Sequence, residues 1–177
     1  RSLENMIHPW SMQISLRLGE HGWSELDLWL EDEHKDFCIT HIFDSPMASI
    51  AEALLSLRRG SSEASFVLHE EPGRNFWRIA QLPKKQHLLL VEISVNDDNF
   101  DNSFSAPGLV FEVERDFFIG SFILELDKIA FQLRFPRFAV DRTVEDFPWD
   151  ALAELKSSTA ANNAQHHKSD RAGESEA

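Results

Sequence analysis

The chain has 177 residues, of which 42% are hydrophobic, enough for one domain with a proper core. Its 30 acidic and 17 basic residues give a formal net charge of −13, which repels phosphate backbones and anionic lipid surfaces. A single cysteine, Cys38, excludes an internal disulfide and a multi-cysteine metal site. We therefore expect a basic protein as partner, with no nucleic acid and no membrane.

The first quarter of the chain predicts a meander of three strands. Apolar and polar side chains alternate over residues 10–18 and again over 23–30, which is the period of half-buried strands. Residues 31–34 are polar and predict a turn, and the third strand is expected over 37–43.

Two amphipathic helices are predicted from their end signals and their periodicity. The first begins at Ser45 and Pro46, a capping side chain followed by a residue without an N–H, and it ends at Gly60. The second follows Asp116 as a predicted N-cap and keeps one apolar face as far as Leu133.

Four more strands are predicted, at residues 64–70, 75–81, 87–95 and 108–114. The centre of the third of them, residues 88–91, is continuously apolar and predicts burial on both faces. The element order βββ-α-ββββ-α predicts an α+β fold. We expect one antiparallel, curved sheet of about six or seven strands with two main helices packed on one face.

The domain organisation follows from composition. We expect a single α+β domain over residues 8–156, closed by a short helix that runs to Leu155, and a disordered C-terminal tail over residues 157–177, which are small and polar. No apolar run approaches the roughly 20 residues that span a bilayer, and the first residues lack the apolar stretch of a signal peptide. These features and the lone cysteine predict a cytoplasmic protein.

His69 and Glu70 raise the question of a metal or acid/base site. The residues that follow, 71–74, have proline second and glycine third, as a type II turn requires, and strands are expected on both sides. Adjacent strand residues point to opposite faces, so His69 and Glu70 cannot jointly hold one metal without distortion. We expect a structural hairpin.

The acidic loop near residue 100 was tested as a calcium site. Asp97, Asn99 and Asp101 take the first, third and fifth places of an EF-hand-like pattern, but Asn102 stands where glycine is needed and Gly108 where the bidentate glutamate is needed. We expect a solvated acidic loop. The chain has no nucleophile elbow, no phosphate-binding glycine loop and no dinucleotide motif, so we expect no cofactor, no metal site and no catalytic residue.

One strand favours a protein interface. If the leucines of residues 23–30 face the core, then Trp23, Glu25, Asp27 and Trp29 stand on the outer face, where the two acids lie between the two aromatic anchors. The alternative is that another strand, the last helix or the segment 135–150 covers them.

The charge distribution favours the same region. Residues 1–44 carry nine acids against three bases, and residues 96–116 carry six against one. Asp97, Asp98 and Asp101 therefore join the strand residues above as candidate partner-binding residues.

Five segments carry a resemblance to known proteins. They are residues 23–29, 54–60, 66–73 with Trp77, 108–114 and 147–155. Together they resemble those of a family of small acidic, mostly uncharacterised bacterial proteins, which are similar to immunity proteins of contact-dependent and polymorphic toxin systems. The resemblance spans about residues 20–155 and carries no catalytic motif. It implies a non-enzymatic, antitoxin-like protein-binding module.

Two other classes remain open. One is a small enzyme or ligand-binding protein with a pocket between sheet and helices, using His41, Cys38 or a carboxylate. The other is a structural subunit of a larger complex, which predicts an exposed patch that is mainly apolar instead of acidic.

Overall fold

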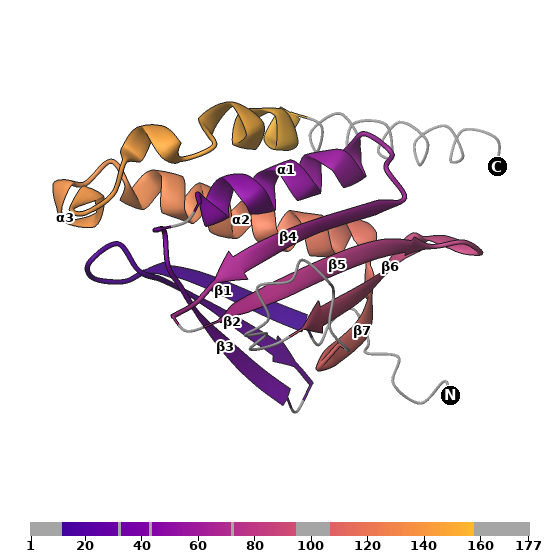
Figure 1. The fold of residues 1–177 in the computed structure, drawn as a ribbon. Helices are drawn as coiled ribbons and strands as arrows, with labels where there is room; N and C mark the ends of the chain where they lie inside the picture. The colour runs from indigo at the N-terminus through magenta and orange to yellow at the C-terminus, as the bar shows by residue number, and fades with distance from the viewer. Residues whose placement is uncertain (1–11, 32, 43, 72, 95–106, 158–177) are drawn as a thin grey trace.

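A computed structural model describes residues 12–31, 33–42, 44–71, 73–94 and 107–157. The predicted order of strands and main helices is confirmed (Figure 1). The predicted acidic loop at 96–102 and the tail after residue 157 lie outside the described residues. The elements are β1 (Met12–Leu18), β2 (Ser24–Leu30), β3 (Glu33–Ile39), α1 (Pro46–Arg58), β4 (Glu63–His69), β5 (Arg74–Leu82), β6 (Lys85–Ser94), β7 (Leu109–Glu114), α2 (Arg115–Gln132), α3 (Pro136–Ala139), a 3-10 turn (Val144–Asp146) and a last helix at 149–157.

The strands form two antiparallel sheets, one in the order β1-β2-β3 and one in the order β4-β5-β6-β7. The prediction of a single curved sheet is therefore wrong, although the α+β class is confirmed. Helix α1 lies between β3 and β4 in the chain, so these two strands are not joined by a hairpin. They meet only near their ends, where the Thr40 amide donates a hydrogen bond to the His69 carbonyl at 2.8 Å. In Figure 1 the strands of the two sheets diverge from this meeting point, and the helices lie on one side of both.

An aromatic cluster joins the two sheets to α2. The Trp77 side chain is fully buried, with its ring centroid 5.6 Å from that of Phe37 in β3 and 5.1 Å from that of Phe66 in β4. Phe122 of α2 adds an edge-on contact at 6.2 Å. Because these rings come from both sheets and a helix, burial of this cluster holds the layers together.

The ends of α1 form as the sequence predicts. The Ser45 hydroxyl accepts a hydrogen bond from the Ala48 amide, and Pro46 is the first helical residue. Gly60 follows the last turn with φ +98°, a conformation that glycine adopts without strain. No helix within the described ranges is both long and apolar enough to cross a lipid bilayer.

The predicted cap of α2 is wrong. Glu114, not Asp116, is the N-cap, and its carboxylate accepts hydrogen bonds from the amides of Asp116 at 3.1 Å and Phe117 at 2.6 Å. β7 runs directly into the helix, so the last strand residue becomes the cap. Its carboxylate also lies at the positive end of the helix dipole.

The third strand begins earlier than predicted. Leu30 pairs with Glu33, and Glu31 adopts φ +50°, so the hairpin turn is tight and the polar residues after it enter β3. Phe37 and Ile39 face the core as expected, but His41 lies beyond the end of the strand. Cross-strand pairing with β2 overrides the polar composition here.

The hairpin after His69 is confirmed. His69 pairs with Arg74, the Glu70 amide donates to the Gly73 carbonyl at 2.9 Å, and Gly73 has φ +102°. The expectation that residues 88–91 are buried on both faces is wrong. Within this stretch only the alternate side chains of Leu89 and Val91 are fully buried, because helices cover one face of this sheet.

Candidate functional site

The side of the β1–β3 sheet that points away from the core carries most of the predicted partner-binding strand residues. The strand register places Arg17 of β1 opposite Glu25 of β2, and Trp29 of β2 opposite His34 of β3. Because side chains of directly paired residues share a face, one surface collects residues from all three strands. We call this surface the outer face; it comprises Arg17, Glu25, Asp27, Trp29, His34 and Asp36.

Asp27 lies at the centre of the outer face and is only 5% exposed. One carboxylate oxygen accepts a hydrogen bond from Arg17 Nη2 at 2.8 Å, and the other lies 2.9 Å from His34 Nε2. Asp27 is thus covered by its own neighbours. It orients Arg17 and His34 and is not presented to a partner as the sequence suggested.

Trp29 and the two acids beside Asp27 are accessible. The Trp29 indole is half-buried and stacks on the His34 ring, with centroids 4.8 Å apart and planes 9° from parallel. Glu25 and Asp36 are exposed. An ordered aromatic ring on the same face as these carboxylates combines an apolar anchor with charges that attract a basic surface.

Trp23 lies at the opposite end of β2 from Trp29. It precedes β2, while Trp29 lies six residues further along the extended chain, about 20 Å away. Trp23 is half-buried, and its carbonyl oxygen accepts hydrogen bonds from the Gly19 amide at 2.8 Å and from Arg142 at 2.6 Å. The two tryptophans therefore do not form one anchor. The remaining predicted residues, Asp97, Asp98 and Asp101, lie outside the described residues.

The thiol of Cys38 sits at the edge of the outer face among carboxylates. Partial burial, followed by the charges of Glu70, Glu25 and Asp36, raises the pKa of this thiol above its ordinary value. Only the thiolate is an effective nucleophile, so Cys38 is poorly suited to covalent catalysis near neutral pH.

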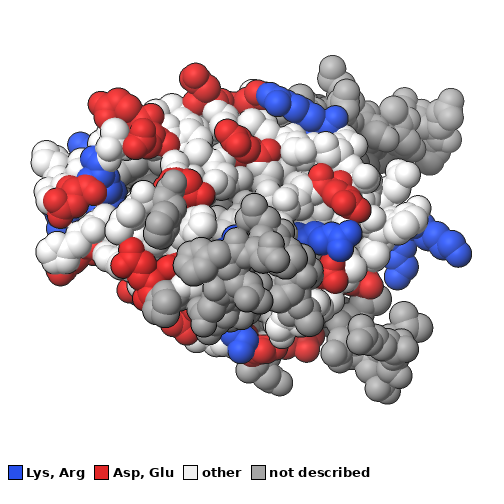
Figure 2. Space-filling model, in the orientation of Figure 1, with Lys and Arg blue, Asp and Glu red and all other residues white. Residues whose placement is uncertain are grey.

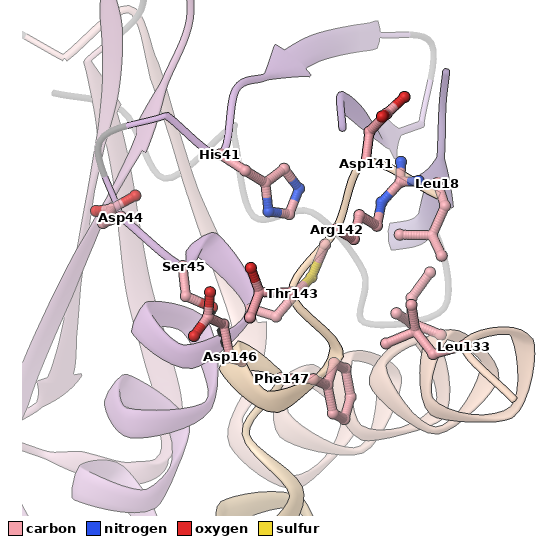
Figure 3. A pocket seen from close by; sticks show the side chains of 12 residues that line it. Leu18, His41, Asp44, Ser45, Leu133, Asp141, Arg142, Thr143, Asp146 and Phe147 are labelled. Atoms are coloured by element: carbon pink, nitrogen blue, oxygen red, sulfur yellow. Dashed lines mark hydrogen bonds between the residues drawn. The ribbon is translucent and has the colours of Figure 1, made fainter. Parts of the chain in front are cut away.

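A separate pocket of about 140 Å³ lies where the end of β1, the segment after β3, the start of α1 and the end of α2 meet residues 141–147. Figure 3 shows the His41 ring facing Arg142 across this space. The polar and charged lining residues are His41, Asp44, Ser45, Asp141, Arg142, Thr143 and Asp146.

His41 makes a hydrogen bond to a buried serine. Its Nε2 lies 2.8 Å from the Ser24 hydroxyl, and burial together with the positive charge of Arg142 lowers the pKa of His41 to about 4. A serine beside a neutral histidine resembles part of a hydrolytic triad. Ser24 is fully buried, however, so its hydroxyl cannot reach a substrate. The pair is structural.

Arg142 connects the pocket wall to the turn between β1 and β2. Its Nη2 donates to the carbonyls of Gly19 and Trp23, both at 2.6 Å, and its Nη1 donates to the carbonyl of Phe138 at 3.1 Å. The guanidinium is therefore engaged by backbone oxygens. The lining acid Asp44 has a pKa raised by burial, an effect that the nearby His69 reduces.

Sequence reasoning singled out His41 but not its surroundings. Ser24, Asp44 and the adjacent pair Asp141 and Arg142 come from three separate segments, and no spacing in the sequence connects them. Asp44, Asp141 and Arg142 lie in polar stretches outside the predicted strands and main helices, whereas Ser24 lies within a predicted strand and gave no signal. Within the part of the chain that the structure describes, no three His, Cys, Asp or Glu side chains are grouped to hold a metal ion.

Comparison with known proteins finds no family model, no curated protein and no solved structure that matches the chain.

Proposed function

We propose that this chain is a non-enzymatic protein-binding module, an antitoxin-like immunity protein that binds a basic partner through the outer face. The observation that carries this proposal is the Trp29 indole, held against His34 on the same face of the sheet as the exposed carboxylates of Glu25 and Asp36. The family resemblance of the sequence agrees with it. The mechanism is occlusion of the partner's active surface, steered by charge.

The network around Asp27 supports this function by fixing the anchor. Asp27 holds the His34 ring, and His34 stacks on Trp29, so the indole is ordered before a partner arrives. Preordering reduces the side-chain entropy that binding would otherwise cost. Figure 2 shows Asp and Glu side chains in several separate patches of the visible surface, with fewer patches of Lys and Arg, and this excess of acid extends the attraction for a basic protein beyond the outer face.

The first test is capture of the partner. The tagged chain is incubated with a lysate of its source organism at low and high salt, and the retained proteins are identified by mass spectrometry. We expect one stoichiometric basic protein whose retention falls as salt rises. Retention of nothing at either salt contradicts the proposal.

Variants then test the surface with the captured partner. Trp29→Ala should raise the dissociation constant by roughly tenfold or more, mainly through faster dissociation, whereas Glu25→Gln with Asp36→Asn should lower the association rate. The matched control is Glu52→Gln with Asp150→Asn, which removes two exposed acids elsewhere and should leave association nearly unchanged. Equal reductions of the association rate in the control and in the outer-face variant contradict the assignment of this surface as the binding site.

The pocket around His41 favours a second candidate function, the binding of a small polar ligand. The favouring observation is an uncharged imidazole facing Arg142 in a cavity that also has carboxylates in its wall. A thermal-shift screen of small amines and carboxylic acids tests it. A ligand that stabilises the wild type but not His41→Gln would support this function, and the absence of any such ligand would contradict it.

A further inference from the structure

The end of α2 and the short helix α3 expose an aromatic groove. Its charge differs from that of the rest of the chain, which is acidic. Phe131 is 58% exposed and Phe135 47% exposed, and their rings lie edge to face with centroids 5.3 Å apart. The groove has a volume of about 650 Å³. Aromatic rings are rarely left open to water in a group, so such a surface indicates contact with another molecule. The groove is lined by Lys128, Phe131, Gln132, Phe135, Arg137 and Phe138.

The charge of the groove is opposite to that of the chain. Residues 128–140 contain Lys128, Arg134 and Arg137 and no acidic residue, in a chain of net charge −13. Lys128 is bonded to Glu125, but Arg134 and Arg137 make no ion pair with any described residue. The Arg137 guanidinium carbon lies 4.5 Å from the centre of the Phe138 ring. The groove thus offers apolar walls and the cation of Arg137 to an anionic occupant, and the exposed Arg134 lies in the turn between the lining residues Gln132 and Phe135.

We propose that this groove binds an acidic polypeptide segment of a second protein, one that carries apolar side chains between its carboxylates. The apolar side chains would pack against Phe131 and Phe135, and the carboxylates would pair with Arg134 and Arg137. The concave shape of the groove favours a peptide over a flat membrane surface. This site is independent of the outer face, which attracts partners of the opposite charge.

The experiment uses the whole chain and a fluorescein-labelled synthetic peptide, Asp-Glu-Phe-Glu-Glu-Leu-Phe-Glu-Asp, followed by fluorescence anisotropy. We expect saturable binding that weakens with salt. Phe131→Ala with Phe135→Ala, and Arg134→Glu with Arg137→Glu, should each weaken binding by about tenfold or more. Because these side chains are exposed, neither pair should prevent folding, which the thermal melt of each variant checks.

Matched controls distinguish binding at this groove from nonspecific binding elsewhere on the surface. Leu124→Ala removes an apolar side chain of α2 that is 71% exposed and lies outside the groove lining, and Lys84→Glu with Lys85→Glu reverses two cations of the β5–β6 turn. Both should change the affinity less than about twofold. If the control variants lost as much affinity for the peptide as the groove variants do, the proposal would be overturned.

The remaining outcomes concern the occupant. A peptide with lysine in place of every acid, and one with alanine in place of phenylalanine and leucine, should each bind at least about tenfold more weakly. Failure of the acidic peptide to bind up to about 1 mM would overturn the proposal. So would groove-dependent binding to phosphatidylserine vesicles without peptide binding, or groove-dependent dimerisation of the chain alone, since each would assign a different occupant.

Discussion

The Glu70 carboxylate accepts a hydrogen bond from the Cys38 backbone amide at 3.0 Å, and so connects β3, an edge strand of the first sheet, to the β4–β5 hairpin of the second. Burial raises the pKa of Glu70, and the hydrogen bonds from Asn75 and the Cys38 amide reduce this rise. Together with the bond from the Thr40 amide to the His69 carbonyl, this contact closes the junction between the sheets.

We expect Glu70→Ala to lower the free energy of unfolding by about 1 kcal/mol, because an edge amide loses its acceptor and the two sheets lose a connection. Urea denaturation at neutral pH measures the change. Glu71→Ala, at the exposed neighbouring position, is the control and should cost less than about 0.5 kcal/mol. Equal losses at the two positions would show that the contact does not stabilise the junction.

Trp77 should be the most sensitive position of the core. Trp77→Ala empties the space between Phe37, Phe66 and Phe122 and should cost about 3–5 kcal/mol. Trp77→Phe should cost about 1–2 kcal/mol, since the indole nitrogen is buried without a hydrogen-bond partner among the described residues and little polar interaction is lost. Denaturant unfolding measures both, and equal costs would contradict this account.

His41 predicts a dependence of stability on pH. Its pKa is lowered from 6.5 to about 4 in the folded chain, so the unfolded chain binds the proton more tightly. The contribution of neutral His41 to the free energy of unfolding is fully present above pH 6.5 and is lost as the pH falls towards 4. Relative to His41→Gln, the wild type should lose on the order of 1–2 kcal/mol over this range, a value reduced for the partial exposure of the ring.

Urea midpoints of the wild type and of His41→Gln, taken at intervals between these pH values, measure this loss. His87→Gln, which removes an exposed histidine of β6, is the control and should follow the wild type. A wild type that runs parallel to His41→Gln at all pH values would contradict the buried, neutral state of His41.

Cys38 should react slowly with iodoacetamide. Partial burial and the carboxylates of Glu70, Glu25 and Asp36 raise the pKa of the thiol above 9.0, so little thiolate is present at pH 8 and the rate should keep rising beyond pH 9. Asp36→Asn should increase the rate at pH 8, because it removes one of the negative charges. The control is Asp116→Asn, a distant exposed position, and an unchanged rate in Asp36→Asn would contradict the electrostatic explanation.

The order of the elements and the ends of α1 could be predicted from the sequence, because local chemistry decides them. A serine followed by proline starts α1, and Gly60 ends it, whatever lies elsewhere in the chain. The hairpin at Gly73 likewise depends on a glycine conformation within four residues. The start of β3 was misjudged because pairing with β2, not composition, extends that strand to Glu33.

The candidate sites were predictable only in part. Alternation placed Glu25 and Trp29 on the outer face, since strand geometry alone sends successive side chains to opposite sides. The burial of Asp27 depends on Arg17 and His34, which strand pairing brings from β1 and β3.

The sequence by itself determined the order of the strands and main helices, the leucine face of β2 that meets the core, and the net acidic charge. Only the tertiary structure decided that the strands divide into two sheets and that Ser24, His41 and Arg142 meet at one pocket. It also decided that Phe131 and Phe135 remain uncovered by the described chain. Periodicity and capping act over a few neighbouring residues, whereas these outcomes depend on which distant surfaces exclude water from one another.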